Sequence, residues 1–164
     1  MSGEHPESAV EIVNRQRRYD LDRGVLVMAI DAVLELCGEA GQVVTVTLVS
    51  DRTMKQINRD YRGLNQPTDV LSFSMREGDG GDVSGMMLGD LVVSLETIVR
   101  QAGESFTDGR PETGTAQREL ALMTIHGLLH LMGFAHEEGG FDEAQMITRE
   151  HELFNQTWEF FPVF

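Results

Sequence analysis

Three of the five histidines lie close together in the segment HGLLHLMGFAH, residues 126–136. His126 and His130 are four positions apart, so on a helix their side chains lie one above the other, close enough to bind one cation. Gly133 can end that helix in the left-handed conformation and turn the chain back, which would bring His136 to the same ion. Three imidazoles leave the fourth position of a tetrahedral zinc ion open for water, as in catalytic sites. The spacing therefore predicts a site for one Zn²⁺ ion.

The glycine at position 127 limits the reactions that this site is expected to catalyse. Zinc proteases carry the pattern H-E-x-x-H, in which the glutamate is the general base. Gly127 occupies the position of that glutamate here, which disfavours peptidase chemistry. The metal itself must then lower the pKa of its water to about 7 and polarise the scissile group. We also expect the missing side chain to leave room beside the metal for a bulky group such as a phosphodiester.

Four cations at helical spacing form a second candidate site. Separations of three, four and three residues keep them within about a quarter of a helix circumference. These residues, called the basic row below, are Arg52, Lys55, Arg59 and Arg62. The apolar residues Met54, Ile57 and Tyr61 fall on the opposite side and are expected to face the core. The row is either a solvated helix face or a surface that follows a nucleic-acid backbone, and the spacing leaves both open.

The charge of the chain is unevenly distributed. The formal net charge of −14 at pH 7 excludes a protein coated evenly in positive charge. Residues 1–62 hold eight basic and ten acidic residues, whereas residues 63–164 hold five basic and seventeen acidic ones. Contact with a polyanion is therefore expected mostly from the first part, which contains the basic row.

The composition predicts a soluble, cytoplasmic protein. Hydrophobic residues make up 41% and charged residues 24%, as in globular proteins. The single cysteine, Cys37, excludes an internal disulfide framework and favours a reducing compartment. No apolar run approaches the roughly 18 residues that a bilayer span needs. Residues 1–20 lack the apolar core of a secretory signal.

Strands and helices are expected to alternate along the chain and to position these residues. Helical periodicity covers residues 25–37, 118–132 and 142–158, and strand-like patterns cover 42–49, 68–75 and 88–94. Ser50 or Asp51 can cap the helix of the basic row, and Gly63 can close it. The glycine-rich residues 76–87 are expected to form a mobile loop or an irregular hairpin connection. We predict one α/β (α+β) domain over residues 1–164, with a small mixed sheet covered by helices and a glycine turn after the zinc-site helix.

The chain resembles the YbeY endoribonuclease family, also described as ribosomal RNA maturation factors. Its most specific match is HGLLHLMGFAH at 126–136, against the family signature H-G-x-L-H-L-x-G-x-x-H. Supporting segments, in the order of the family, are INRDYR at 57–62, PTDVLSF at 67–73 and LGD at 88–90. The resemblance covers about residues 43–155.

The resemblance implies that His126, His130 and His136 bind zinc in a single α/β domain. It also implies cleavage of single-stranded RNA, maturation of the 3′ end of small-subunit ribosomal RNA, and ribosome quality control. The implied partners are the small ribosomal subunit and assembly factors, including a ribosome-associated GTPase. Arg62 aligns with an arginine held important in the family, and we expect it to stabilise charge that develops on phosphorus.

One position departs from the family pattern. The family usually has Asp just before the third histidine, where this chain has Ala135. If that Asp orients a ligand or moves a proton, the surroundings of the metal are altered here. Two other interpretations stay open. One is a metal-dependent hydrolase of peptides or amides, and the other is a non-enzymatic ribosome assembly factor whose zinc only stabilises the fold.

Overall fold

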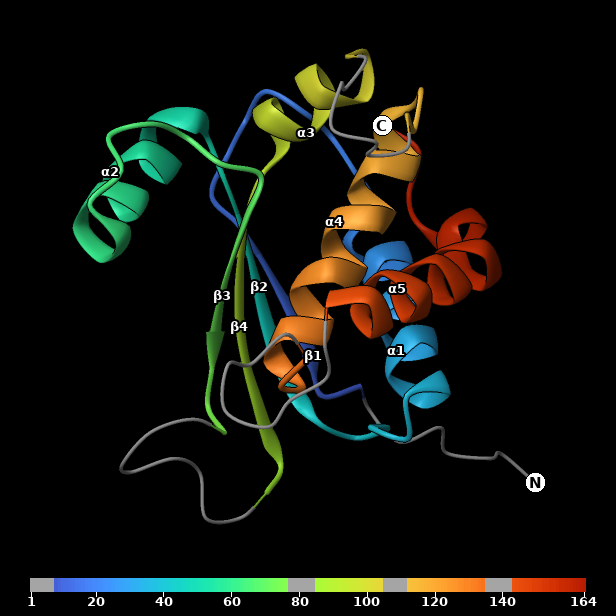
Figure 1. Cartoon of the computed structure of the whole chain (residues 1–164). Coiled ribbons are helices and arrows are strands. Elements are labelled where there is room, and N and C mark those ends of the chain that lie inside the picture. The colour runs from blue at the N-terminus through green and yellow to red at the C-terminus, as the bar shows by residue number, and fades with distance from the viewer. Residues whose placement is uncertain (1–7, 77–84, 105–111, 135–142) are drawn as a thin grey trace.

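A computed structural model describes residues 8–76, 85–104, 112–134 and 143–164 of the chain. This described part forms a mixed four-stranded β-sheet with helices on both faces (Figure 1). Its elements are β1 (Val10–Asn14), α1 (Arg23–Leu36), β2 (Val43–Val49), α2 (Asp51–Arg62), β3 (Val70–Ser74), β4 (Met87–Ser94), α3 (Leu95–Ala102), α4 (Ala116–Leu131), α5 (Glu143–Thr157) and the 3₁₀ helix η1 (Trp158–Phe160). The predicted α/β class with a small mixed sheet is confirmed.

The sheet combines parallel and antiparallel pairing. Its strand order is β1-β2-β4-β3, with β1, β2 and β4 parallel and the edge strand β3 antiparallel to β4. In the central strand β2, Val44 and Val46 are buried while Thr45 and Thr47 are half-buried, which is the alternation expected of a strand. The sheet therefore has one fully packed face and one partly covered face.

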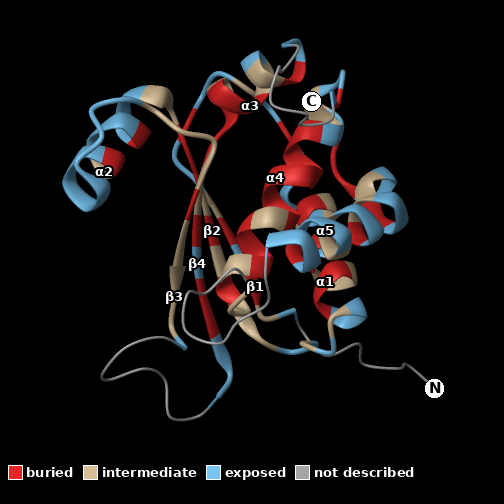
Figure 2. Ribbon diagram, viewed as in Figure 1, coloured by how far each residue is buried: buried red, intermediate tan, exposed pale blue. Residues whose placement is uncertain are grey.

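The larger core lies between the sheet and the helices α1, α4 and α5, and α4 occupies its centre (Figure 2). Between Leu120 and Leu131, every residue except the two histidines is buried. Burying one leucine or isoleucine side chain stabilises a fold by about 1.5–3 kcal/mol. Helix α4 is thus anchored along its length and provides a fixed base for the residues that it carries.

A smaller core joins α2 to the opposite face of the sheet. Its buried members are Val49, Met54 and Leu71, with Ile57, Phe73 and Val92 packed against them. The neighbouring β3 residues Val70 and Ser72 face α4 instead, because side chains alternate along a strand. The sheet therefore separates α2 from α4 (Figure 1).

Helix α4 approaches the sheet closely at Gly127. A Cβ atom at this position would lie 2.9 Å from Leu91 Cδ2 and 3.1 Å from Val70 Cγ2. The Ser72 hydroxyl also donates a hydrogen bond to the Gly127 carbonyl, at 3.2 Å. The expectation that Gly127 leaves room for substrate is wrong, because this glycine faces the sheet and its missing side chain lets the helix and the sheet pack together.

The ends of α2 are as predicted, but its apolar side is not. The Ser50 hydroxyl accepts a hydrogen bond from the backbone N–H of Thr53, and Gly63 ends the helix in the left-handed conformation with a φ of 70°. Met54 is buried and Ile57 is half-buried, whereas Tyr61 is 72% exposed. The prediction that Tyr61 faces the core is wrong, because the small core ends before the last turn of α2.

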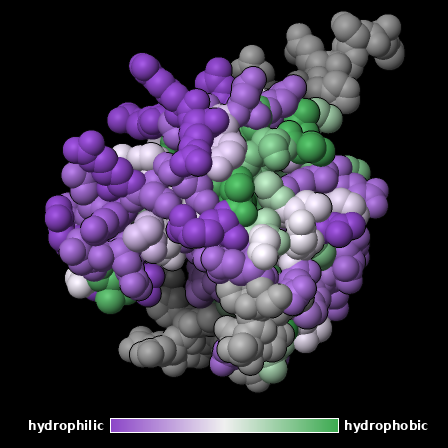
Figure 3. Space-filling view, turned by 90° about the horizontal axis from the view of Figure 1, so that it is seen from above, coloured by the Kyte–Doolittle hydropathy of each residue, from purple (hydrophilic) through white to green (hydrophobic). Residues whose placement is uncertain are grey.

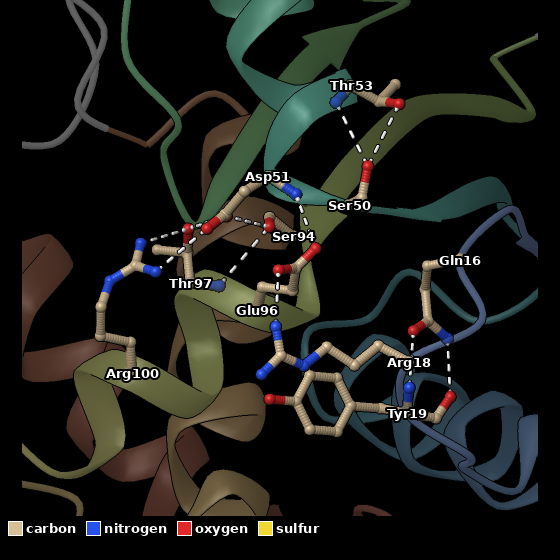
Figure 4. A network of polar contacts seen from close by, with 10 residues as sticks. All are labelled: Gln16, Arg18, Tyr19, Ser50, Asp51, Thr53, Ser94, Glu96, Thr97 and Arg100. Atoms are coloured by element: carbon tan, nitrogen blue, oxygen red, sulfur yellow. Dashed lines mark hydrogen bonds and ion pairs between the residues drawn. The ribbon is translucent and has the colours of Figure 1, made fainter.

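Asp51 fastens the start of α2 to α3 (Figure 4). Its Oδ1 atom accepts hydrogen bonds from the hydroxyls of Ser94, at 2.7 Å, and Thr97, and its Oδ2 atom accepts one from Arg100 at 3.0 Å. Burial by itself raises the pKa of Asp51, but these hydrogen bonds and the Arg100 charge outweigh it and lower the pKa below its ordinary value. Folding therefore favours the ionised carboxylate.

The main element absent from the sequence prediction is β1, which pairs in parallel with β2. Two of its residues, Val10 and Ile12, are buried, so its apolar pattern is too short to predict a strand.

Residues 77–84 of the predicted loop lie outside the described residues. None of the helices formed by the described residues combines the length and the hydrophobicity that a bilayer span requires.

Candidate functional site

The last two turns of α4 bring the histidine pair together. The Nε2 atoms of His126 and His130 lie 3.1 Å apart, and their ring centroids lie 4.6 Å apart. Two nitrogen ligands at about 2.0–2.1 Å from a tetrahedral zinc ion lie roughly 3.3 Å from each other. The partial negative charge of the helix C-terminus also favours a cation here. Both rings are half-buried, so the pair fits a metal ion that substrate can reach.

Glu150 of α5 contacts His126 on the other side of the ring. Its Oε1 atom lies 2.9 Å from His126 Nδ1. The Glu150 side chain is 12% exposed, against 36% for His126. Since a carboxylate only accepts hydrogen bonds, Nδ1 donates the proton, and in the neutral ring the lone pair then lies on Nε2, which faces His130. The contact therefore leaves His126 in the form that can ligate a metal.

Glu150 is not among the site residues that the sequence predicts. The available signal was its position on α5, at helical spacing from Met146 and Leu153, which are both buried. A carboxylate on such an apolar face needs a polar partner. Nothing in the sequence identifies that partner, because His126 is 24 residues away along the chain.

The third predicted ligand, His136, lies outside the described residues, as does Ala135. Gly133 precedes them with a φ of 92°, the left-handed conformation that was predicted to turn the chain after the helix. Among the residues with a described position, no group of three or more His, Cys, Asp or Glu side chains is arranged to hold a metal ion. The role of His136 therefore stays a prediction.

All four residues of the basic row are exposed. The surface over α2, at the left of Figure 3, is mostly hydrophilic. Arg59 makes a long ion pair with Asp60, at 3.5 Å. In the described part of the chain, the row makes no hydrogen bond or ion pair with either histidine, and α2 and α4 pack on opposite faces of the sheet (Figure 1). The RNA-binding role of the row and the catalytic role of Arg62 stay predictions.

Tyr61 adds an exposed aromatic ring beside Arg62. Its ring meets that of Phe73 edge-on, with centroids 5.2 Å apart and planes at 68°. This geometry is favourable for aromatic pairs and orients the Tyr61 ring while leaving most of it in solvent. The end of α2 therefore offers cations and an aromatic face together.

Comparisons with known proteins agree with this fold and with the family resemblance. A family profile described as endoribonuclease YbeY matches residues 11–158. A Geobacter sulfurreducens protein named endoribonuclease YbeY is 35% identical over 147 residues, which cover 88% of this chain and 93% of that protein. A Symbiobacterium thermophilum protein of the same name is 46% identical over 133 residues, covering 75% of this chain and 78% of that protein. A Thermotoga maritima protein of known solution structure matches with a TM-score of 0.57 and 24% identity, over 92% of this chain and 89% of its own, which supports the fold alone.

Proposed function

Because the chain belongs to the YbeY endoribonuclease family, we propose that it is a zinc-dependent endoribonuclease that cleaves single-stranded RNA. Its proposed substrate is the precursor of small-subunit ribosomal RNA, whose 3′ end it matures. It would act in the cytoplasm, in ribosome quality control, with the small subunit and assembly factors that include a ribosome-associated GTPase. The observation that carries the proposal is the 3.1 Å convergence of the His126 and His130 Nε2 atoms.

The proposed metal ligands are His126, His130 and His136. When bound, the zinc ion supplies a Lewis acid and a water whose pKa is lowered to about 7. The half-exposed histidines suit such an open site, whereas structural zinc sites are closed by four protein ligands. The buried leucines of α4 pack without help from the histidines, which argues against a metal that only stabilises the fold.

The basic row supports RNA as the substrate. Lys55 and Arg59 would hold the backbone by charge, and Arg62 can contact a phosphate through two parallel hydrogen bonds. The edge strand β3 contacts both α2 and α4, so an RNA strand that reaches α2 and the histidine pair can pass around this edge. A flexible single strand can bend around an edge and stack an unpaired base on Tyr61, which a rigid duplex cannot do.

The test measures bound zinc and RNA cleavage on the same preparations. The wild type is expected to contain one zinc ion per chain and to cut unpaired RNA. Cleavage should stop with a chelator and resume when zinc is returned. His130→Ala should lose both zinc and cleavage. The matched control His151→Ala, which removes an exposed histidine from α5, should keep both.

Three outcomes would contradict the proposal. Full zinc retention in His130→Ala would remove the ligand assignment. Cleavage of a peptide or amide in place of RNA would favour a different metal-dependent hydrolase. A protein that never cuts RNA and unfolds on chelation would instead be an assembly factor with a structural zinc ion.

A further inference from the structure

Glu150 occupies an unusual position for a charged side chain. On α5 it lies in line with Met146, Leu153 and Thr157, at spacings of four, three and four residues, and these three are buried. The Glu150 side chain is itself 12% exposed. A carboxylate that has lost most of its water destabilises the fold unless a hydrogen-bond partner compensates. Core packing alone would favour an apolar residue here.

The partner of Glu150 is a histidine and not a permanent cation. Within the described chain, its polar contact is the 2.9 Å approach of Oε1 to His126 Nδ1. The adjacent Arg149 is directed elsewhere, with one nitrogen 3.2 Å from Glu152 Oε2 and another donating to the Leu36 carbonyl at 2.9 Å. Glu150 is therefore not part of an ordinary surface ion pair.

The contact decides which nitrogen of His126 can bind a metal. With Nδ1 donating to the carboxylate, Nε2 has no hydrogen and its lone pair is directed toward His130 Nε2, 3.1 Å away. In the other tautomer, a hydrogen on Nε2 would occupy the place of the ion. A carboxylate behind a ligating imidazole also fixes the ring orientation and increases the electron density on the ligating nitrogen.

We propose that Glu150 is a positioning residue that holds His126 in the metal-binding tautomer and so sets the affinity of the histidine pair for zinc. It acts through His126 and touches neither the ion nor the RNA. The inference rests on the proposed function, because it concerns the same metal-binding pair.

The experiment compares Glu150→Ala and Glu150→Gln with the matched control Glu152→Gln. Glu152 lies on the same helix with an exposed side chain. Long-range ¹H–¹⁵N correlation spectra of metal-free protein report which nitrogen of His126 carries the hydrogen. Competition with a chelator reports zinc affinity, and denaturant unfolding reports whether each variant is folded.

In the wild type, His126 is expected to carry its hydrogen on Nδ1. Glu150→Ala should lose this preference and bind zinc about 10–100-fold more weakly. Glu150→Gln should show a smaller loss, because its amide oxygen still accepts from Nδ1 without the negative charge. Glu152→Gln should match the wild type in both measurements.

Wild-type tautomer and wild-type zinc affinity in Glu150→Ala would overturn the inference. If Glu150→Ala does not fold, Glu150→Gln provides the test, because glutamine keeps the volume of the side chain. Unchanged zinc affinity in Glu150→Gln would also overturn the inference. A lower kcat with unchanged zinc affinity would make Glu150 a catalytic base and contradict a positioning role. A wild-type chain that binds no zinc would instead overturn the proposed function itself.

Discussion

The two helices that carry the predicted functional residues are built in opposite ways. Helix α4 is buried from Leu120 to Leu131 except at its two histidines, whose Nε2 atoms meet at 3.1 Å. Helix α2 buries Met54 and Asn58 and exposes all four cations of the basic row. Metal coordination needs ligands fixed within a few tenths of an ångström, whereas attraction of phosphates acts over several ångströms. The proposed metal ligands thus lie on a rigid, buried helix, and the proposed RNA-binding residues lie on an exposed one.

The two helices are also held to the rest of the fold by different kinds of contact. Apolar packing against the sheet holds α4, as at Gly127. Helix α2 depends more on polar contacts at its ends, with the Ser50 cap and the Asp51 contacts at one end and Gly63 at the other. Changes that fill space should therefore affect α4 most, and changes in charge or pH should affect α2 most.

The largest effect on stability is expected from Gly127→Ala. The added methyl group would meet Leu91 Cδ2 and Val70 Cγ2 at 2.9 and 3.1 Å, so these buried side chains or α4 must shift, at a cost of about 1–3 kcal/mol. Denaturant unfolding measures this loss. Gly24→Ala near the exposed start of α1 is the control and should change stability by less than about 1 kcal/mol. If Gly127→Ala and Gly24→Ala lower the free energy of unfolding equally, the close packing at Gly127 is not what holds α4 to the sheet.

A charge change at the start of α2 should have the next largest effect. Asp51→Asn removes the ion pair with Arg100 and weakens the contacts with α3, which is expected to cost about 1–2 kcal/mol at pH 7. Because folding lowers the pKa of Asp51, its charge stabilises the fold above the unfolded pKa of about 3.9. This stabilisation is lost as the pH falls through the folded pKa.

Unfolding curves across pH check the sign of this effect. The stability difference between wild type and Asp51→Asn should be constant above about pH 5 and shrink below about pH 4. Asp60→Asn on the same helix removes an exposed carboxylate and should have little effect at any pH. A difference that grows on acidification would contradict the role assigned to Asp51.

Arg62→Ala tests whether α2 takes part in the reaction or only in binding. We expect Arg62→Ala to lower kcat/KM for RNA about tenfold, with zinc content unchanged. Because α2 and α4 pack on opposite faces of the sheet, a rise in KM alone would assign Arg62 to binding. Steady-state cleavage kinetics with zinc analysis measure both. A loss mainly in kcat would place Arg62 at the scissile phosphate, as the sequence predicted, and would end the division of tasks between the helices.

The smallest effect is expected from Lys55→Ala. Removing one exposed phosphate contact should weaken RNA binding a few-fold and lower the salt slope of log K by about one. Stability should change by less than about 0.5 kcal/mol. Arg23→Ala, which removes an exposed cation from α1, is the matched control and should leave the slope unchanged. If Lys55→Ala also leaves the salt slope unchanged, the basic row does not contact RNA.

The sequence predicted the features that depend on neighbours in the chain. The i, i+4 spacing was enough to bring His126 and His130 together, because helical geometry repeats every 3.6 residues. The ends of α2 at Ser50 and Gly63 followed from local capping rules. The alternation in residues 42–49 likewise predicted the central strand β2.

The features that the sequence did not predict involve contacts between distant segments. Tyr61 has the spacing of a core residue, yet the small core does not reach it. Gly127 was interpreted as space beside a metal, but it faces Leu91 and Val70 of the sheet. The short strand β1 exists because β2 offers it a hydrogen-bonded partner.

By itself, the sequence determined the family, the α/β class and the histidine pair, because motif spacing and helical period are properties of the chain. Only the tertiary structure decided that Glu150 stands behind His126 and that the sheet separates the histidine pair from the basic row. The physical reason is that these relations depend on how helices pack on the two faces of a sheet. That packing is a sum of many weak contacts between distant residues, and no local pattern in the sequence records it.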